Sequence, residues 1–168
     1  MTWLAAPRIV APFVTVALLA GCSAKADSEL SASDPTFAGL DSEVTKEVLA
    51  SPVAEDRVAG DDPAVASARY QGMVRNFVLC RDAYASYKTW LKSGESPGLP
   101  RQPNPTNPAP TAGDMEADIK LFRDDLDSGD ISLVRERLSS ANGCGGWIPA
   151  TPGDLSGQTI ADAVKAGR

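Results

Sequence analysis

Cysteine is the residue type in this chain with the most defined chemistry, and histidine is absent. Cys22, Cys80 and Cys144 are the three cysteines in 168 residues. Without imidazole, the sequence lacks the commonest general base and metal ligand, so neither a Ser-His-Asp nor a Cys-His site can be built. Two thiols without histidine leave a zinc site half complete, and no Cys-x-x-Cys pair indicates a redox role. We therefore expect no metal and no cofactor.

Cys22 follows a short N-terminal segment of mostly apolar residues. This run, residues 9–19, is 11 residues long and is broken by Pro12. At about 1.5 Å per residue, such a helix is too short to cross a hydrocarbon core of about 30 Å. It is typical of the apolar region of a signal peptide. The order Leu19-Ala20-Gly21-Cys22 then places two small residues before a thiol, and here the chain resembles bacterial lipoprotein precursors.

The resemblance covers about the first 22 residues and implies where the protein is located. It implies that residues 1–21 are a signal peptide and that Cys22 is alkylated by diacylglycerol before cleavage. Two or three acyl chains, palmitate among them, would anchor the mature protein stably to the cell membrane on its extracytoplasmic face, with membrane lipid as its first partner. The alternative is an ordinary secretory signal cleaved after Ala24-Lys25-Ala26. Both alternatives export the chain.

Export determines what the other two cysteines do. With Cys22 acylated, Cys80 and Cys144 are the only remaining pair. Disulfides form and persist in oxidising compartments outside the cytosol. We therefore predict a Cys80–Cys144 disulfide.

The charges alternate along the chain. The net charge is −6, and it becomes −7 once Arg8 is removed with the signal peptide. Residues 27–64 carry −8, residues 65–93 carry +4, and residues 114–127 carry −4. The acidic balance of the whole chain argues against nucleic-acid binding, because neutralising phosphates requires a basic face. We favour a basic helix lying beside acidic neighbours, with a basic face for anionic lipid or wall polymer as the alternative.

The N-terminal part of the mature chain has little periodicity. Residues 22–40 are small and polar and predict a flexible tether. Within residues 41–62 we expect one short helix over 43–50, capped by Asp41 or Ser42 and ended by Ser51-Pro52, followed by a loop over 54–62.

A long helix gives the strongest structural signal. Asp62 is a good N-cap, Pro63 suits the first helical position, and Gly94 is a good C-terminal stop. Between them, apolar residues repeat at alternating spacings of three and four and predict one buried face. We favour a core face over a ligand groove for this seam, which comprises Tyr70, Met73, Phe77, Cys80, Tyr84, Tyr87 and Leu91.

A proline-rich stretch follows the long helix. Six prolines in the 14 residues from Pro97 to Pro110 exclude helix and inner strand. Long loops of this kind are often functional or disordered. A plain crossover between two helices is the favoured interpretation, and an extended segment that docks on a partner is the alternative.

Three shorter helices are predicted beyond the loop. Thr111 and Asp114 match a capping box at the start of the first of these helices. Asp130 can cap the second helix, and Asn142-Gly143 ends it. Residues 151–154 can open the third helix. An ion pair between Glu116 and Lys120, four residues apart, would stabilise the first of these helices. No segment alternates as a strand does. The fold class is therefore all-α, with residues 63–168 forming a small domain of one long helix and about three shorter ones. Their expected inward residues are Met115, Ile119, Phe122 and Leu126, then Ile131, Val134 and Leu138, then Ile160 and Val164.

Two further patterns resemble ligand sites. Residues 125–130 and Glu136 have the spacing of a calcium loop, but Gly129 precedes Asp130 where the order should be reversed, so an acidic turn between helices is favoured. The glycines at 143, 145 and 146 could form an anion-binding nest. A tight turn that lets Cys144 form its disulfide is the simpler interpretation.

The function indicated is a non-catalytic binding or scaffolding module at the cell envelope, whose partner is an unknown envelope protein or polymer. The alternative is an envelope hydrolase that uses carboxylates alone, as glycosidases do. No acid lies in an apolar run that would raise its pKa, which disfavours this alternative. We expect the contact surface to combine the Pro97–Pro110 loop with the basic residues Arg75, Arg81, Lys88, Lys92 and Arg101.

The lipid anchor gives the first testable prediction. Cys22→Ser should abolish acylation and release the mature protein from membranes, because only this thiol follows the small-residue pair. Metabolic labelling with a fatty-acid analogue, followed by membrane fractionation, measures both effects. An unlabelled, soluble wild-type chain beginning after Ala26 would contradict the assignment.

Overall fold

The computed structural model describes residues 30–100, 112–140, 144 and 146–167. These residues are mostly helical, and the only β-type pairing among them is an isolated antiparallel bridge between Pro149 and Thr159. The all-α prediction is confirmed. The elements are η1 (Pro35–Phe37), α1 (Ser42–Leu49), α2 (Pro52–Val58), α3 (Pro63–Ser93), α4 (Ala112–Asp127), α5 (Ile131–Ser139) and α6 (Ile160–Lys165).

The long helix α3 forms as its sequence predicts. The Asp62 carboxylate accepts hydrogen bonds from the backbone N–H groups of Ala64 and Val65, each at 3.0 Å. Pro63 takes the first helical position, where no N–H is needed. Gly94 ends the helix with a φ of 78°, a left-handed conformation that glycine adopts without strain.

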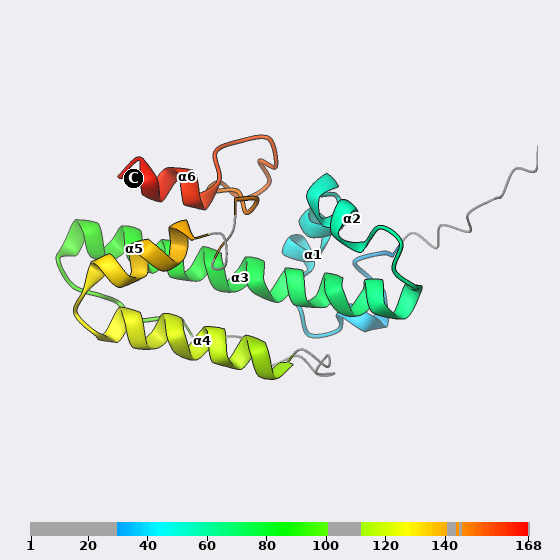
Figure 1. Cartoon of the computed structure of the whole chain (residues 1–168), viewed down its shortest axis with the longest axis horizontal. Helices are drawn as coiled ribbons and strands as arrows, with labels where there is room; N and C mark the ends of the chain where they lie inside the picture. Colours follow the sequence, from blue (N-terminus) through cyan, green and yellow to red (C-terminus); the bar gives the residue numbers. More distant parts are fainter. Residues whose placement is uncertain (1–29, 101–111, 141–143, 145, 168) are drawn as a thin grey trace, which may run out of the picture.

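The other helices pack along α3 (Figure 1). Helices α1 and α2 lie beside its N-terminal half, whereas α5 and α6 lie beside the half that ends at Ser93. Helix α4 runs in the same direction as α3, and α5 returns in the opposite direction. Helix α3 therefore ends at the opposite end of the bundle from the start of α4.

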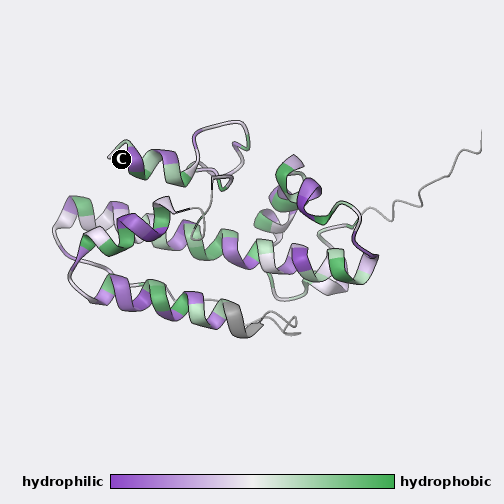
Figure 2. Cartoon of the chain, viewed as in Figure 1, coloured by the Kyte–Doolittle hydropathy of each residue, from purple (hydrophilic) through white to green (hydrophobic). Residues whose placement is uncertain are grey.

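Each helix turns an apolar face towards α3 or its neighbours, and apolar and polar residues alternate around the helices (Figure 2). Most of the predicted α3 seam is buried, but Leu91 is 49 % exposed and Trp90 is buried in its place. Including Leu91 was wrong because an α-helix has 3.6 residues per turn, so a seven-residue repeat drifts by about 20° per heptad. The confirmed members are Tyr70, Phe77, Cys80, Tyr84 and Tyr87, with Met73 partly buried.

Two expectations for the N-terminal part are wrong. The predicted tether is too long at its C-terminal end, because Phe37 is only 3 % exposed and Thr36 accepts a hydrogen bond from Gln71 of α3. The segment 54–62 was expected to be a loop, but α2 occupies most of it. Ser51-Pro52 ends α1 and also opens α2, since proline suits the first position of a helix.

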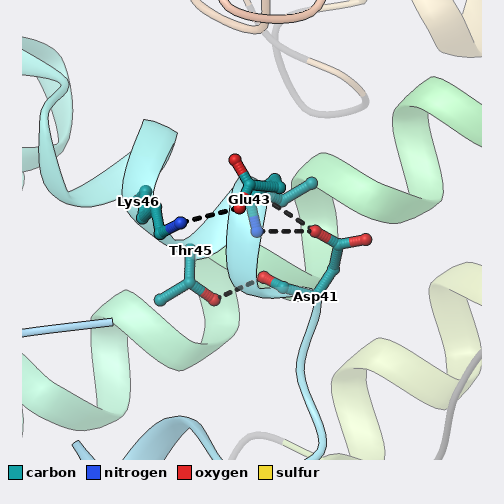
Figure 3. A network of polar contacts seen from close by, with 5 residues as sticks. Asp41, Glu43, Thr45 and Lys46 are labelled. Atoms are coloured by element: carbon teal, nitrogen blue, oxygen red, sulfur yellow. Dashed lines mark hydrogen bonds and ion pairs between the residues drawn. The ribbon is translucent and has the colours of Figure 1, made fainter. Parts of the chain in front are cut away.

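Helix α1 begins with a network of local hydrogen bonds (Figure 3). Asp41 is its N-cap and accepts from the backbone N–H groups of Glu43 and Val44 at 3.0 and 2.9 Å. The buried Thr45 hydroxyl donates to the Asp41 carbonyl at 2.7 Å, and Lys46 pairs with Glu43. The two bonds to the Asp41 carboxylate satisfy backbone N–H groups that the first turn leaves without helical partners.

The inward faces of α4 and α5 are as predicted. Met115, Phe122 and Leu126 are buried and Ile119 is partly buried, while α5 buries Val134 and Leu138. Asp130 caps α5 through the backbone N–H of Ser132. The predicted caps at Thr111, Asp114, Asn142 and Gly143 lie outside the side chains that the structure describes.

Two details of these last helices differ from expectation. Lys120 pairs with Asp124 at 2.5 Å, one turn ahead, and no ion pair with Glu116 is observed in the described part of α4. The last helix begins at Ile160 and not at 151–154, because Gly153 adopts a φ of 78° in a turn and Thr159 supplies the N-cap. Ile160 and Val164 are fully buried as expected.

A disulfide joins the middle of α3 to the chain beyond α5. The Cα atoms of Cys80 and Cys144 lie 5.4 Å apart, within the usual range for such a bond, and both residues are fully buried. The predicted pairing is confirmed. It fixes the turn that follows α5 directly onto the central helix.

Removing this bond gives the second prediction. The double variant Cys80→Ala, Cys144→Ala should lose about 2–4 kcal/mol of unfolding free energy, because the bond closes a loop of 64 positions in the unfolded chain. Urea unfolding followed by circular dichroism measures the loss. Peptide mapping of the wild-type protein that found both thiols free would contradict the pairing.

Candidate functional site

Arg81, one of the predicted surface cations, is engaged within the protein. Its guanidinium lies 2.6 Å from the Glu47 carboxylate of α1, and the two side chains are only 17 % and 9 % exposed. The same Arg81 group lies 4.8 Å from the centre of the Phe77 ring. Glu47 also accepts from the backbone N–H of Gly153 at 3.1 Å. This pair is the arrangement expected of a basic helix beside an acidic neighbour.

The remaining predicted cations do not form one surface. At 3.6 residues per turn, Arg81, Lys88 and Lys92 fall within roughly 40° on α3, whereas Arg75 lies about 100° away. The Lys88 ammonium lies 4.3 Å from the centre of the Tyr84 ring. Arg101 lies outside the described residues. The structure therefore groups only part of the predicted basic set.

The start of the proline-rich loop packs against the domain. The Ser86 hydroxyl donates to the Gly98 carbonyl at 2.7 Å, and Leu99 packs on the core. These contacts lie near the end of α4, since a Cβ on Gly98 would stand 3.9 Å from Asp127. Residues 101–110 of the loop lie outside the described part.

The acidic turn between α4 and α5 holds its carboxylates in structural roles. Asp125 is buried and accepts from Arg137 Nε at 2.5 Å. Asp130 accepts from the hydroxyl and the backbone N–H of Ser132, and these two bonds lower its pKa. In the part of the chain that the structure describes, no group of three or more metal-ligating side chains occurs. Of the predicted glycine nest only Gly146 is described.

A pocket lies between α2, α3, α4 and the turn after the disulfide. We call it the Trp147 pocket. Its volume is about 370 Å³, within the usual range for small-molecule sites. It is lined by Arg57, Ala68, Arg69, Gly72, Met73, Asn76, Met115, Asp118 and Trp147.

Trp147 forms one wall of the pocket and is held from two sides. It follows Cys144 by three residues, so the disulfide brings it onto α3. Its ring lies 4.9 Å from the Phe77 ring, centre to centre, with a tilt of 59°. The Arg57 guanidinium lies 5.2 Å from the ring centre, a cation–π distance. The indole is thus sandwiched between α3 and α2.

Arg69 ties the end of α2 to α3 beside this wall. It donates to the Arg57 backbone carbonyl at 3.0 Å, and its Nε lies 3.1 Å from an Asp61 carboxylate oxygen. The Asp61 side chain is largely shielded from solvent, and the Arg69 charge compensates its negative charge. Tyr70 is buried in the same part of α3, and burial, with the Glu55 charge as a smaller cause, raises its pKa.

Asn76 and Asp118 are the other polar residues of the pocket. Asn76 Oδ1 lies 3.6 Å from Cys80 Sγ, but a half-cystine has no proton to donate, so this is a contact and not a hydrogen bond. The Asn76 amide therefore has no hydrogen-bond partner among the described residues. Asp118 is exposed on α4 and has an interaction partner in the structure.

Sequence reasoning missed most of this pocket. Met73 was expected in the core seam, and it is the one residue of that seam that lines the pocket. Gly72 was an available signal, because a glycine inside a 31-residue helix costs stability and usually has a packing or functional reason. Arg57 gave no signal, since it lies in the segment expected to be a loop.

Comparison with known proteins gives no family. No family model matches the chain, and no curated protein or solved structure is significantly similar to it. None of the described helices is both long and apolar enough to cross a membrane. Cys22 and the signal segment lie outside the described residues.

The third prediction concerns the attachment of α2. Arg69→Gln should change the unfolding free energy by less than about 1 kcal/mol, because the Arg69 side chain is 56 % exposed and surface ion pairs contribute little. Backbone amides at 57–61 should nevertheless exchange hydrogen faster, since the tie to the Arg57 carbonyl is lost. Hydrogen exchange with mass spectrometry measures this, with Arg135→Gln as the control. Unchanged exchange at 57–61 would contradict the tie.

Proposed function

We propose that this protein is an exported lipoprotein, anchored to the cell membrane through Cys22, that acts as a non-catalytic binding module at the cell envelope. The Trp147 pocket is its binding site. The observation that carries the proposal is the lining of the pocket, which combines two methionines and an indole with a few polar groups. Binding sites typically combine a mostly apolar surface with a small number of polar groups that orient the ligand.

Met73 and the Trp147 indole suit binding more than packing. Met73 and Trp147 are only partly buried although both are large and apolar. Methionine adapts to irregular apolar shapes, and tryptophan provides a large rigid contact surface. A ligand that covers such side chains removes apolar surface from water, which stabilises the complex.

A carboxylate hydrolase remains the alternative function, and its requirements are specific. It needs an acid in a low-dielectric site that raises its pKa, with a second carboxylate nearby. The buried Asp125 is paired with Arg137 and does not line the pocket. Asp118 lines the pocket but is exposed. No contact in the described residues favours this chemistry over binding.

The fourth prediction tests the pocket as a binding site. The neutral apolar dye N-phenyl-1-naphthylamine should bind to the wild-type protein and fluoresce, and Met73→Gln should weaken its affinity about tenfold or more by placing an amide in the apolar lining. Leu121→Gln, on the exposed face of α4, is the matched control and should bind like wild type. Melting temperatures show whether each variant is folded.

Equal dye affinity in wild type, Met73→Gln and Leu121→Gln would contradict the proposal, as would the absence of dye binding. Hydrolysis of a chromogenic glycoside by wild type that is lost in Asp118→Asn would favour the hydrolase.

A further inference from the structure

Arg57 is the cation of the pocket whose charge is not matched by a carboxylate. Arg69 is paired with Asp61, whereas no ion pair to Arg57 is found among the described residues. The Arg57 guanidinium instead stands over the face of Trp147. Stacking on an indole leaves the edge of the guanidinium, with its N–H donors, available to an oxygen acceptor.

The Asn76 amide adds a second unused polar group in the same pocket. Its neighbours Met73 and Gly72 on α3 also line the pocket. An amide and a guanidinium together can give several hydrogen bonds to one small anionic head group. Phosphate-binding sites usually collect more positive charge than this pocket has, so a singly charged carboxylate is the better match.

Asp118 limits where such a head group can lie. It is on α4, whereas Arg57 is on α2, and a negative charge on α4 disfavours a carboxylate beside it. The head group must therefore lie on the α2 and α3 side, beside Arg57 and Asn76. The apolar body of the ligand then lies along Met73, Met115 and Trp147.

We propose that the Trp147 pocket binds a small amphipathic carboxylate, with its head group on Arg57 and Asn76 and its apolar body against Met73, Met115 and Trp147. This inference rests on the proposed function and specifies its ligand class. The volume of about 370 Å³ is near the small end for ligand sites, so the apolar body is short.

Isothermal titration calorimetry with three probes of equal chain length tests the charge preference. Octanoate, octanol and octyltrimethylammonium share one apolar body and differ in their head groups. Octanoate should bind the full-length protein about tenfold more tightly than octanol, and the cation should bind most weakly. Because Arg57 is exposed, the preference for octanoate should shrink at high salt.

Two variants locate the head group. Arg57→Gln should bring the octanoate affinity to within about threefold of the octanol affinity, with octanol binding itself little changed. Asn76→Ala should weaken the binding of octanoate more than the binding of octanol. Arg135→Gln removes an exposed arginine on α5 and should bind all three probes like wild type.

Equal affinity for octanoate and octanol, tighter binding of the cation, or an unchanged octanoate preference in Arg57→Gln would overturn the proposal. Binding of an acidic peptide without binding of octanoate would overturn it in favour of a protein partner. If the neutral dye binds at Met73 but none of the octyl probes binds, the ligand class is wrong and the binding function stands. If the dye also fails, the binding function falls too.

Discussion

The Cys80–Cys144 bond determines where the chain lies after α5. It connects the centre of α3 to a turn that has few apolar residues of its own, and both half-cystines are fully buried. Trp147 follows three residues later and reaches Phe77, which is on the turn of α3 that precedes Cys80. One wall of the pocket thus depends on a covalent link and not on helix packing alone. In a domain of this size, such a link is a substantial part of the stability.

Buried and half-buried ion pairs set the position of the other elements around α3. Glu47 on α1 joins Arg81 on α3 to the backbone of Gly153, so one carboxylate connects three segments that are far apart in sequence. Arg137 and Asp125 join α5 to α4 in a similar way. The charge alternation along the chain is therefore used inside the fold. Arg81 is thus engaged within the fold, whereas no ion pair to Arg57 is found among the described residues, and in our proposal Arg57 is the cation that meets the ligand.

The sequence predicted the long helix well and the pocket poorly, for different physical reasons. Asp62, Pro63 and Gly94 act through local backbone chemistry, which is visible in any sequence. The Cys80–Cys144 pairing followed from the number of cysteines and the inferred compartment. By contrast, α2 is short and its position depends on contacts of Arg69 and Ala54 with distant residues. The Trp147 pocket needs four segments to meet, and no local pattern encodes that meeting.

The central claim is that the disulfide holds the segment after α5, and with it the pocket wall, on α3. Hydrogen exchange on oxidised and reduced protein tests it most directly. Two backbone amides in this segment are bonded in the structure, Ala150 to Gln158 and Ile160 to Ile148, each at 2.8 Å. Reduction should speed exchange at these amides while the centre of α3 stays protected. Equal protection of Ala150 and Ile160 in both forms would contradict it.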